Sequence, residues 1–505
     1  MKRPQLTLIT SAAIASIALI LSGCTVGPNY VKPPAPVTPN FKEPPPDNFK
    51  ETKDWEVAQP GTPGMPVKWW EIFGDSQLNE LEEQVPTSNE SLKIAEANFR
   101  KARAMIQFNR AAQFPTISTG PGISSLRDSS HQPYFPPTAG GATGQFTLPF
   151  DLSYEIDFWG RIRRSVTAAR EETQASAADL ATATLGLQAE LAFDYFELRS
   201  ADAQKQVLDD TVKAYETALE LTENRFEGGA SPKSDVAQAQ TQLDSAQVQQ
   251  TDVGVDRAQF EHAIAVIIGK PPAAFSLAEV SRPFAPPGIP VGLPSQLLER
   301  RPDIAAVERR MAEANEQIGI ARAAFYPTVI LSATGGFEGT SLLNWFNWPS
   351  RFWAVGGSAA QTLFDAGRRR ASSEIAISSY DALVASYRET TLEAFQQVED
   401  NLAALRILEK EAQQARETVE SAQESLQLST NRYQGGVDNY LQVLTAQTIA
   451  LSNERNEVDI LRRRMDASVL LIKALGGGWN VSNLPQISEL RNRALGPGGE
   501  PDNAH

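Results

Sequence analysis

The sequence predicts an α+β membrane protein built from two similar halves, in which long helices pack as coiled coils and a few strands cross a lipid bilayer. Three observations support this prediction. A secretion and lipidation signal opens the chain, one block of about 110 residues recurs at a constant offset, and each copy of the block separates a long helical pattern from a strand pattern.

The first 24 residues resemble a bacterial lipobox. Residues 2–3 form a basic start, residues 6–21 an apolar run, and residues 22–23 the small pair that a signal peptidase requires before its cut. Cys24, the only cysteine in the chain, follows directly. The resemblance implies a signal peptide at 1–23 and a covalent diacylglycerol and N-acyl lipid on Cys24. A buried core cysteine is the alternative. Thr25, in place of Asp, implies sorting to the outer membrane.

Composition and charge exclude several classes of protein. The net charge is −15, and removal of residues 1–23 makes it −17, so we expect no nucleic-acid binding. The three histidines, His131, His262 and His505, are scattered, and one cysteine cannot form a disulfide within the chain, so we expect no metal and no other cofactor. No phosphate-binding loop, dinucleotide fingerprint or nucleophile elbow occurs, and we expect no enzymatic activity.

An internal duplication organises the chain. Residues 224–229, Asn-Arg-Phe-Glu-Gly-Gly, recur as Asn-Arg-Tyr-Gln-Gly-Gly at residues 431–436, and the same offset of 207 pairs other glycines and arginines of the two copies. Upstream segments match at an offset of 212. We therefore predict the following division: a proline-rich strap with a short helix at 24–86, repeat 1 at 87–282, a linker at 283–294, repeat 2 at 295–477 and a C-terminal tail at 478–505.

A very long helix is predicted in each repeat. No proline occurs between Pro149 and Pro232, and apolar residues there follow the three-four spacing of a coiled-coil seam. The seam residues are Ala177, Leu180, Thr184, Leu187, Leu191 and Leu198, repeated by Val384, Tyr387, Thr391, Ala394, Val398 and Leu405. A helix of roughly 67 residues would be about 100 Å long. Because the shorter helices predicted at 88–112 and 233–268 together match that length, we expect them to stack end to end beside it.

Strand patterns occupy only four segments, near 114–126, 145–157, 327–338 and 352–363. In the second segment, seven apolar residues alternate with polar ones from Phe146 to Phe158, which is typical of a strand with one face toward lipid. Four strands cannot close a barrel, and an open sheet edge cannot face hydrocarbon. The sequence therefore predicts that several chains pool their strands. Aromatic residues from Trp345 to Trp353 suggest a girdle at the membrane surface, or alternatively a soluble core.

Taken together with further motifs, these residues resemble one family. The further motifs are Val26-Gly27-Pro28-Asn29-Tyr30, Phe114-Pro115, Phe325-Tyr326-Pro327, Glu155-Ile156-Asp157-Phe158-Trp159-Gly160-Arg161 and Arg301-Pro302-Asp303-Ile304. From Cys24 to about Gly478, the chain looks like a TolC-like outer-membrane factor of the lipoprotein, NodT-type branch. The resemblance implies a homotrimer in the outer membrane of a Gram-negative bacterium, with a shared 12-stranded barrel that continues into a periplasmic barrel of 12 helices.

The same resemblance implies a function. Such proteins are the passive exit ducts of tripartite efflux systems, which also contain a periplasmic adaptor, or membrane fusion protein, and an inner-membrane pump of the RND type. Two other functions stay open from the residues: an outlet for type I protein secretion on the same fold, and a coiled-coil scaffold lipoprotein without a pore. The cargo, whether a drug or a metal ion, is not readable from the sequence.

The two Gly-Gly turns mark the helix tips. We predict left-handed backbone there, with Arg225 and Arg432 favourable at the negative helix ends, and Ser231 and Asp438 as N-caps of the returning helices. The resemblance implies a periplasmic gate made by Asp438, Leu441, Tyr433 and Arg432, although Asp438 could act as a cap and Leu441 could simply pack between helices. Thr445 stands where relatives often carry an acid. The resemblance also places adaptor contacts at Arg225, Phe226, Gly228, Gly229, Arg432, Tyr433, Gly435 and Gly436.

Two basic clusters lie where strands give way to long helices: Arg161, Arg163 and Arg164 in the first repeat, and Arg368, Arg369 and Arg370 in the second. Positive charge opposes the dipole at the start of a helix, so another interaction must favour it. We expect phosphate head groups of outer-membrane lipid as partners. A solvated, salt-bridged face is the alternative.

Overall fold

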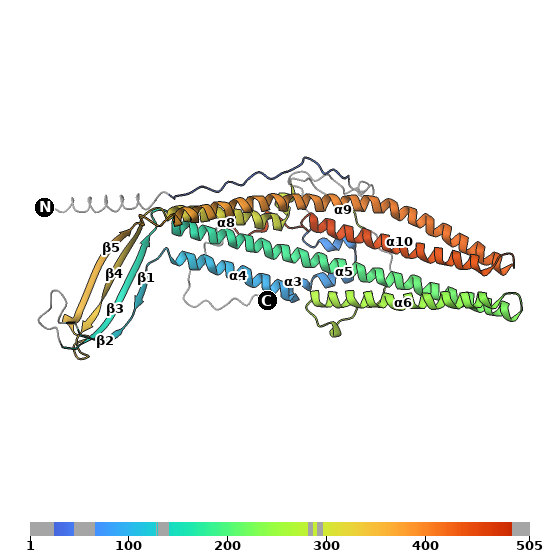
Figure 1. Ribbon diagram of the computed structural model, residues 1–505, viewed down its shortest axis with the longest axis horizontal. Helices are drawn as coiled ribbons and strands as arrows, with labels where there is room; N and C mark the ends of the chain where they lie inside the picture. The colour runs from blue at the N-terminus through green and yellow to red at the C-terminus, as the bar shows by residue number, and fades with distance from the viewer. Residues whose placement is uncertain are drawn as a thin grey trace.

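A bundle of long helices carries an antiparallel sheet at one end, as Figure 1 shows for the computed structural model. The structure describes residues 25–44, 66–127, 129, 141–280, 286–289 and 296–486. Cys24 and the signal segment before it lie outside these residues, as do parts of the strap, the linker and the tail. The elements of the described chain therefore begin with the strap that follows the lipidation position.

Helices of matching length recur in the two halves. The long helices α5 (Arg161–Glu227) and α9 (Arg368–Gln434) have 67 residues each, as the proline-free window predicted. Each turns at the far end of the rod into a returning helix of 35 residues, α6 (Lys233–Ile267) or α10 (Tyr440–Ala474). The helices before the strands, α4 (Glu90–Ala111) and α8 (Pro302–Ala323), have 22 residues each.

The predicted end-to-end stacking is present in both halves. Beside α5, the side chain of Asn89 at the start of α4 donates to the carbonyl oxygen of Ile267 at the end of α6, at 2.8 Å. Beside α9, Arg301 at the start of α8 donates to the carbonyl oxygen of Ala474 at the end of α10, at 3.1 Å. Figure 1 shows each short pair in line along its long helix.

Glycine permits the close approach at both of these junctions. Gly476 follows α10 with φ of 95°, and a Cβ on it would collide with the carbonyl oxygen of Arg300 just before α8. Gly269, the equivalent residue after α6, has φ of 70° and meets Ser88 in the same way. Only glycine combines this backbone conformation with that space.

Short elements complete the chain. Trp69–Phe73 (η2), Ser76–Glu82 (α2) and Val85–Ser88 (α3) lead into α4, and the carboxylate of Asp75 caps α2 by accepting from the backbone N–H groups of Gln77 and Leu78. The remaining short helices are Pro272–Ala274 (η3), Leu297–Arg300 (α7), Trp348–Ser350 (η5) and Val481–Asn483 (η6).

The sheet has the order β1-β3-β4-β5, with β2 also paired to β3. Its strands are Thr116–Thr119 (β1), Gly122–Leu126 (β2), Thr143–Ile156 (β3), Thr328–Gly339 (β4) and Arg351–Ala360 (β5). The first predicted segment was expected to be one strand, but it is broken between Thr119 and Gly122. Pro121 explains the break, because proline cannot donate a ladder hydrogen bond. Within the described chain, β1 and β2 form one free edge and β5 the other.

The main core lies midway along the rod. Trp69 of η2, Tyr195 and Leu198 of α5, Val398 of α9 and Val469 of α10 are all buried in one cluster. Seam positions such as Tyr387, Thr391 and Ala394 are fully buried, as the three-four spacing predicted. These contacts make the central part of both halves one packed unit.

The described part of the strap, residues 25–44, contains no helix or strand and lies against the outside of the helices (Figure 1). At its start, the backbone N–H of Val26 donates to the carbonyl oxygen of Trp159. Further along, Tyr30 donates to the carboxylate of Glu308, at 2.6 Å. At its far end, the backbone N–H groups of Lys42 and Glu43 donate to the two carboxylate oxygens of Glu399, at 2.6 and 2.8 Å.

Candidate functional site: the helix tips and the sheet junction

Both helix tips turn through the same backbone motif. At the end of α5, Ala230 N–H donates to Arg225 O at 2.7 Å and Gly229 N–H to Phe226 O at 2.9 Å. This pattern is a Schellman motif, which requires left-handed backbone at the second glycine. Gly229 has φ of 68°, and its equivalent Gly436 has φ of 73°.

The prediction of left-handed backbone was therefore half right. Only the second glycine of each pair adopts it, because Gly228 and Gly435 have φ of −74° and −71°, in the ordinary helical region. Any residue can adopt that conformation. Gly228 and Gly435 are thus not required by the turn geometry, whereas Gly229 and Gly436 are.

The predicted N-caps are wrong in detail. The N-cap residue of α6 is Pro232, one position after Ser231, and helix α10 follows Asn439 rather than Asp438. The carboxylate of Asp438 binds Arg432 instead, with Nε–Oδ2 at 2.6 Å and Nη2–Oδ1 at 3.2 Å. The Arg432 guanidinium holds the pKa of the Asp438 carboxyl below its ordinary value. This two-point contact bridges the turn between α9 and α10.

Tyr433 is buried at the second tip, with 2% of its surface exposed. Its ring packs edge-on against Tyr440, with centroids 5.4 Å apart, and the cluster also includes Ala239 of α6 and Val443 of α10. Tyr433 was predicted both as a gate residue and as an adaptor contact. Within the described chain it presents no surface for either role, because packing between the two hairpins covers it.

Arg225 joins the two tips. Its guanidinium lies over the Tyr433 ring, 4.7 Å from the centroid, and its Nη1 donates to the carbonyl oxygen of Gln434 at 3.0 Å. A cation placed over an aromatic ring is attracted by the ring's negative face. Arg225 of α5 is thus bound to the C-terminal end of α9, which is a link between the hairpins that the sequence did not reveal.

The two helix tips do present apolar surface. Leu441 is 50% exposed, and Phe226 of the first tip and Val437 of the second are also exposed. The side chain of Thr445 donates to the carbonyl oxygen of Leu441, at 2.8 Å, and so is used within α10. Leu441 is not packed in a core cluster of the described chain and is available to another copy or to a partner.

The basic cluster at the first sheet junction is paired within the chain. Arg161 binds Glu155 at 2.7 Å, and Arg163 lies 3.3 Å from Asp157. Arg164 is buried: it donates to the carbonyl oxygens of Val26 and Pro28 in the strap and binds Glu316 at 2.8 Å. The prediction that Arg164 meets lipid head groups is therefore wrong, since the strap covers it.

The second cluster differs from the first. Arg369 binds Asp365 at 2.6 Å, whereas Arg368 and Arg370 are exposed. Asp365 and Asp157 also accept hydrogen bonds from backbone N–H groups near the starts of α9 and α5. These carboxylates compensate the helix dipoles, which explains how arginines are tolerated there.

An acidic cluster that the sequence did not reveal lies between the hairpins. Arg462 of α10 binds Glu197 of α5 at 2.5 Å, and also contacts Asp466 at 3.1 Å and Asp459 at 2.8 Å. Burial and the Glu197 carboxylate raise the pKa of Asp466 to about 7. Burial, with Glu190 and Glu197, also raises the pKa of Asp194 to about 7. Only the fold brings the α5 and α10 members of this cluster together.

The described residues contain neither a metal-binding cluster nor a membrane-spanning helix. No group of three or more His, Cys, Asp or Glu side chains there could hold a metal ion. Among the helices whose residues are described, none combines the length and apolar character needed to cross a membrane.

Comparisons with known proteins agree with one another. A family described as outer membrane efflux protein matches residues 82–270 and 293–477. Two proteins of Pseudomonas putida, named as the probable efflux pump outer membrane protein SepC and the toluene efflux pump outer membrane protein TtgF, are each 33% identical over 477 residues, which are 94% of this chain and 98% of theirs.

Solved structures are similar as well. The outer-membrane channel OprN matches with a TM-score of 0.81 at 27% identity, over 90% of this chain and all of the OprN chain. The outer membrane channel MtrE of Neisseria gonorrhoeae, described in its open state, matches with a TM-score of 0.78 at 27% identity, over 90% of this chain and 98% of that one.

Proposed function

The chain belongs to the outer membrane efflux protein family and is an outer-membrane efflux channel of a tripartite system, and from this premise we propose how it is assembled. Three copies pool their sheets into a 12-stranded barrel, in which β1 and β2 of each chain together count as one broken strand, and they pool their helices into a periplasmic duct. Small molecules pass through it without bond chemistry, received from a periplasmic adaptor and an RND-type inner-membrane pump.

The free sheet edges carry this proposal. Every backbone group within a bilayer core must find a hydrogen-bond partner, yet the β1/β2 edge and the β5 edge have none within the described chain. Exposed apolar side chains occur on both edge strands, at Ile117, Ile123, Trp353 and Val355. Pairing β5 of one copy with β1 and β2 of the next satisfies both edges and closes a ring.

The tips form the periplasmic end of the proposed duct. Copies of Leu441 would meet around the axis as an apolar plug, because a ring of aliphatic side chains excludes ions by dewetting. The exposed tip surface around Phe226, Gly228, Gly435 and Arg432 is proposed to contact the adaptor. We further propose that lipid on Cys24 and the insertion of the strands together hold the protein in the outer membrane.

The names of the relatives support efflux rather than protein secretion, because they refer to efflux pumps, one of them for toluene. We therefore propose that this chain conducts small organic molecules. Planar-bilayer recording of the purified oligomer tests the duct. We expect discrete ion currents that increase in Leu441→Ala. A silent oligomer, even with both Leu441→Ala and Asp438→Ala, would contradict a pore.

A further inference from the structure

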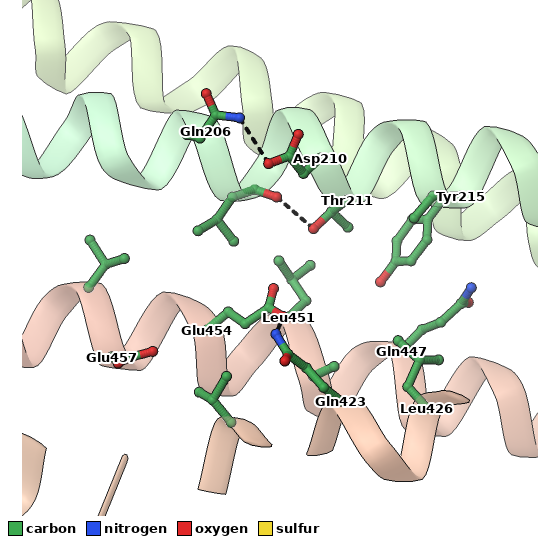
Figure 2. A pocket seen from close by; sticks show the side chains of 15 residues that line it. Gln206, Asp210, Thr211, Tyr215, Gln423, Leu426, Gln447, Leu451, Glu454 and Glu457 are labelled. Atoms are coloured by element: carbon green, nitrogen blue, oxygen red, sulfur yellow. Dashed lines mark hydrogen bonds between the residues drawn. The ribbon is translucent and has the colours of Figure 1, made fainter. Parts of the chain in front are cut away.

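We propose that a pocket between the two helical hairpins of one chain binds amphipathic organic cations that also carry a hydrogen-bond-accepting oxygen. The pocket has a volume of about 480 Å³, within the range of small-molecule sites. Figure 2 shows α5 on one side and the helices of the second hairpin on the other. The proposal requires only the packing of the hairpins and does not depend on which cargo is exported.

The charge of the pocket selects a cation. Asp210, Glu454 and Glu457 line it, and none of its lining residues is basic. Gln423 donates to Glu454 at 2.7 Å, and Gln206 donates to Asp210 at 2.9 Å, so these two carboxylates are held in place by neutral amides. A charge-assisted hydrogen bond from a ligand is stronger than a neutral one.

In the described part of the chain, one basic side chain forms an ion pair with a lining carboxylate. Lys213, which is not a lining residue, has its Nζ 3.5 Å from Asp210 and a side chain that is 72% exposed. It pairs with Asp210 only, and in the described chain no ion pair involves Glu454 or Glu457. These two carboxylates are therefore the ones that a cationic ligand would pair with.

Two polar groups are available to an accepting oxygen. Gln447 lines the pocket, and 6% of its surface is exposed. Its Oε1 accepts from the hydroxyl of Tyr440 at 3.5 Å. Among the described residues its Nε2 has no hydrogen-bond acceptor. The hydroxyl of Tyr215 accepts from Gln242 at 3.2 Å, which leaves its own proton to donate into the pocket. Both donors line the pocket, so an accepting oxygen of a ligand can take the place of water at each of them.

Apolar side chains form the rest of the lining. Val207 of α5, Leu426 of α9, and Leu451 and Val458 of α10 surround the polar groups. Val207 and Leu451 come from different hairpins. An aromatic or alkyl body of a ligand would bury apolar area against both, and the ammonium group would reach Glu454 or Glu457. Simple inorganic cations lack such a body and would gain little from this surface.

A ligand in this pocket would contact both hairpins. The lining residues of α5, 206–215, lie 12 to 21 residues before the end of that helix at Glu227, roughly 18 to 32 Å along its axis. Binding would stabilise the hairpin arrangement described here relative to any arrangement that separates α5 from α10, because the pocket exists only when they are packed.

Photolabelling of the full-length lipidated oligomer tests the proposal. The probe is a benzophenone with an aminomethyl group, which is protonated at neutral pH, so that it combines a cationic hydrogen-bond donor, an aromatic body and a carbonyl oxygen. The control probe carries a neutral hydroxymethyl group at the same position. After irradiation, mass spectrometry should find label on residues 206–215 and 447–458, with about tenfold less from the neutral probe, as expected for one lost charge-assisted contact.

Variants sharpen this test. The double variant Glu454→Gln with Glu457→Gln should lower labelling by the cationic probe about tenfold or more, at unchanged oligomer elution and helix content. Glu223→Gln, which removes an exposed carboxylate of α5 outside the pocket, should leave it unchanged. Equal labelling by both probes, label confined to other segments, or no effect of the double variant would each overturn the proposal.

Discussion

The guanidinium of Arg225 lies 4.7 Å from the ring centroid of Tyr433, and this contact joins the end of α5 to the end of α9. In the duplicated tips, Arg225 corresponds to Arg432, which binds Asp438 instead of a ring, and Tyr433 corresponds to Phe226, which is exposed instead of buried. The two copies of the motif thus perform complementary roles in holding the hairpins together.

Loss of this contact should loosen the tip. In Arg225→Ala, both the cation–π contact and the hydrogen bond to Gln434 are removed, at a cost of about 1 kcal/mol. We expect a roughly fivefold increase in the open fraction of the channel in planar bilayers. Glu227→Gln changes an exposed charge at the same tip and is the matched control. Identical currents in Arg225→Ala and the unmodified protein would argue against the link.

Leu441 should limit ion passage at the periplasmic end. Leu441→Ala shortens the exposed side chain proposed to form the plug, so conductance should increase. Leu392→Ala is the control, since Leu392 is exposed to a similar degree on α9, away from the tip. A rise in both variants would point to general loosening, and a rise in neither would remove Leu441 from the gate.

The two glycines of each tip should behave differently. Gly436→Ala forces a side chain into left-handed backbone and should destabilise the tip by roughly 1–2 kcal/mol. Gly435→Ala, at a helical φ, should be neutral or slightly stabilising. Thermal unfolding followed by circular dichroism measures the difference. Because Gly435→Ala preserves the turn, any loss of adaptor binding in it would report on the surface alone.

The acidic cluster should make stability depend on pH. Burial and Glu197 raise the pKa of Asp466 from 3.8 to about 7, so between these values the native state binds a proton that the unfolded state does not. The stabilisation is complete below pH 3.8 and is lost as the pH rises through 7. Asp466→Asn should therefore flatten the change in Tm between pH 4.5 and 7.5. Asp252→Asn, which replaces an exposed aspartate of α6, should leave the change in Tm between these pH values as it is in the unmodified protein.

Sequence periodicity predicted the long elements well. The proline-free window and the coiled-coil seam gave the 67-residue helices, and strict alternation located β3, because both signals extend over many residues. The ends of the four predicted strand segments lie within three residues of the observed ends, but the break at Pro121 was not predicted.

These sequence patterns did not predict which side chains contact one another. Asp438 satisfies the local pattern of a cap but binds Arg432, and Arg164 belongs to a basic cluster yet is covered by the strap. Tyr433 is buried because an arginine 208 positions earlier in the chain lies on it. Each of these outcomes depends on contacts between distant segments, which periodicity does not encode.

Disulfide trapping across the proposed subunit boundary tests the shared barrel most directly. One cysteine is placed at Ser118 in β1 and a second is scanned along residues 352–358 of β5, with a pair at Thr147 and Glu338 as a control within one chain. We predict that at least one scanned position yields covalent dimers and trimers on a denaturing gel. Only monomers at every scanned position, while the control pair forms its disulfide, would contradict the pooling of strands.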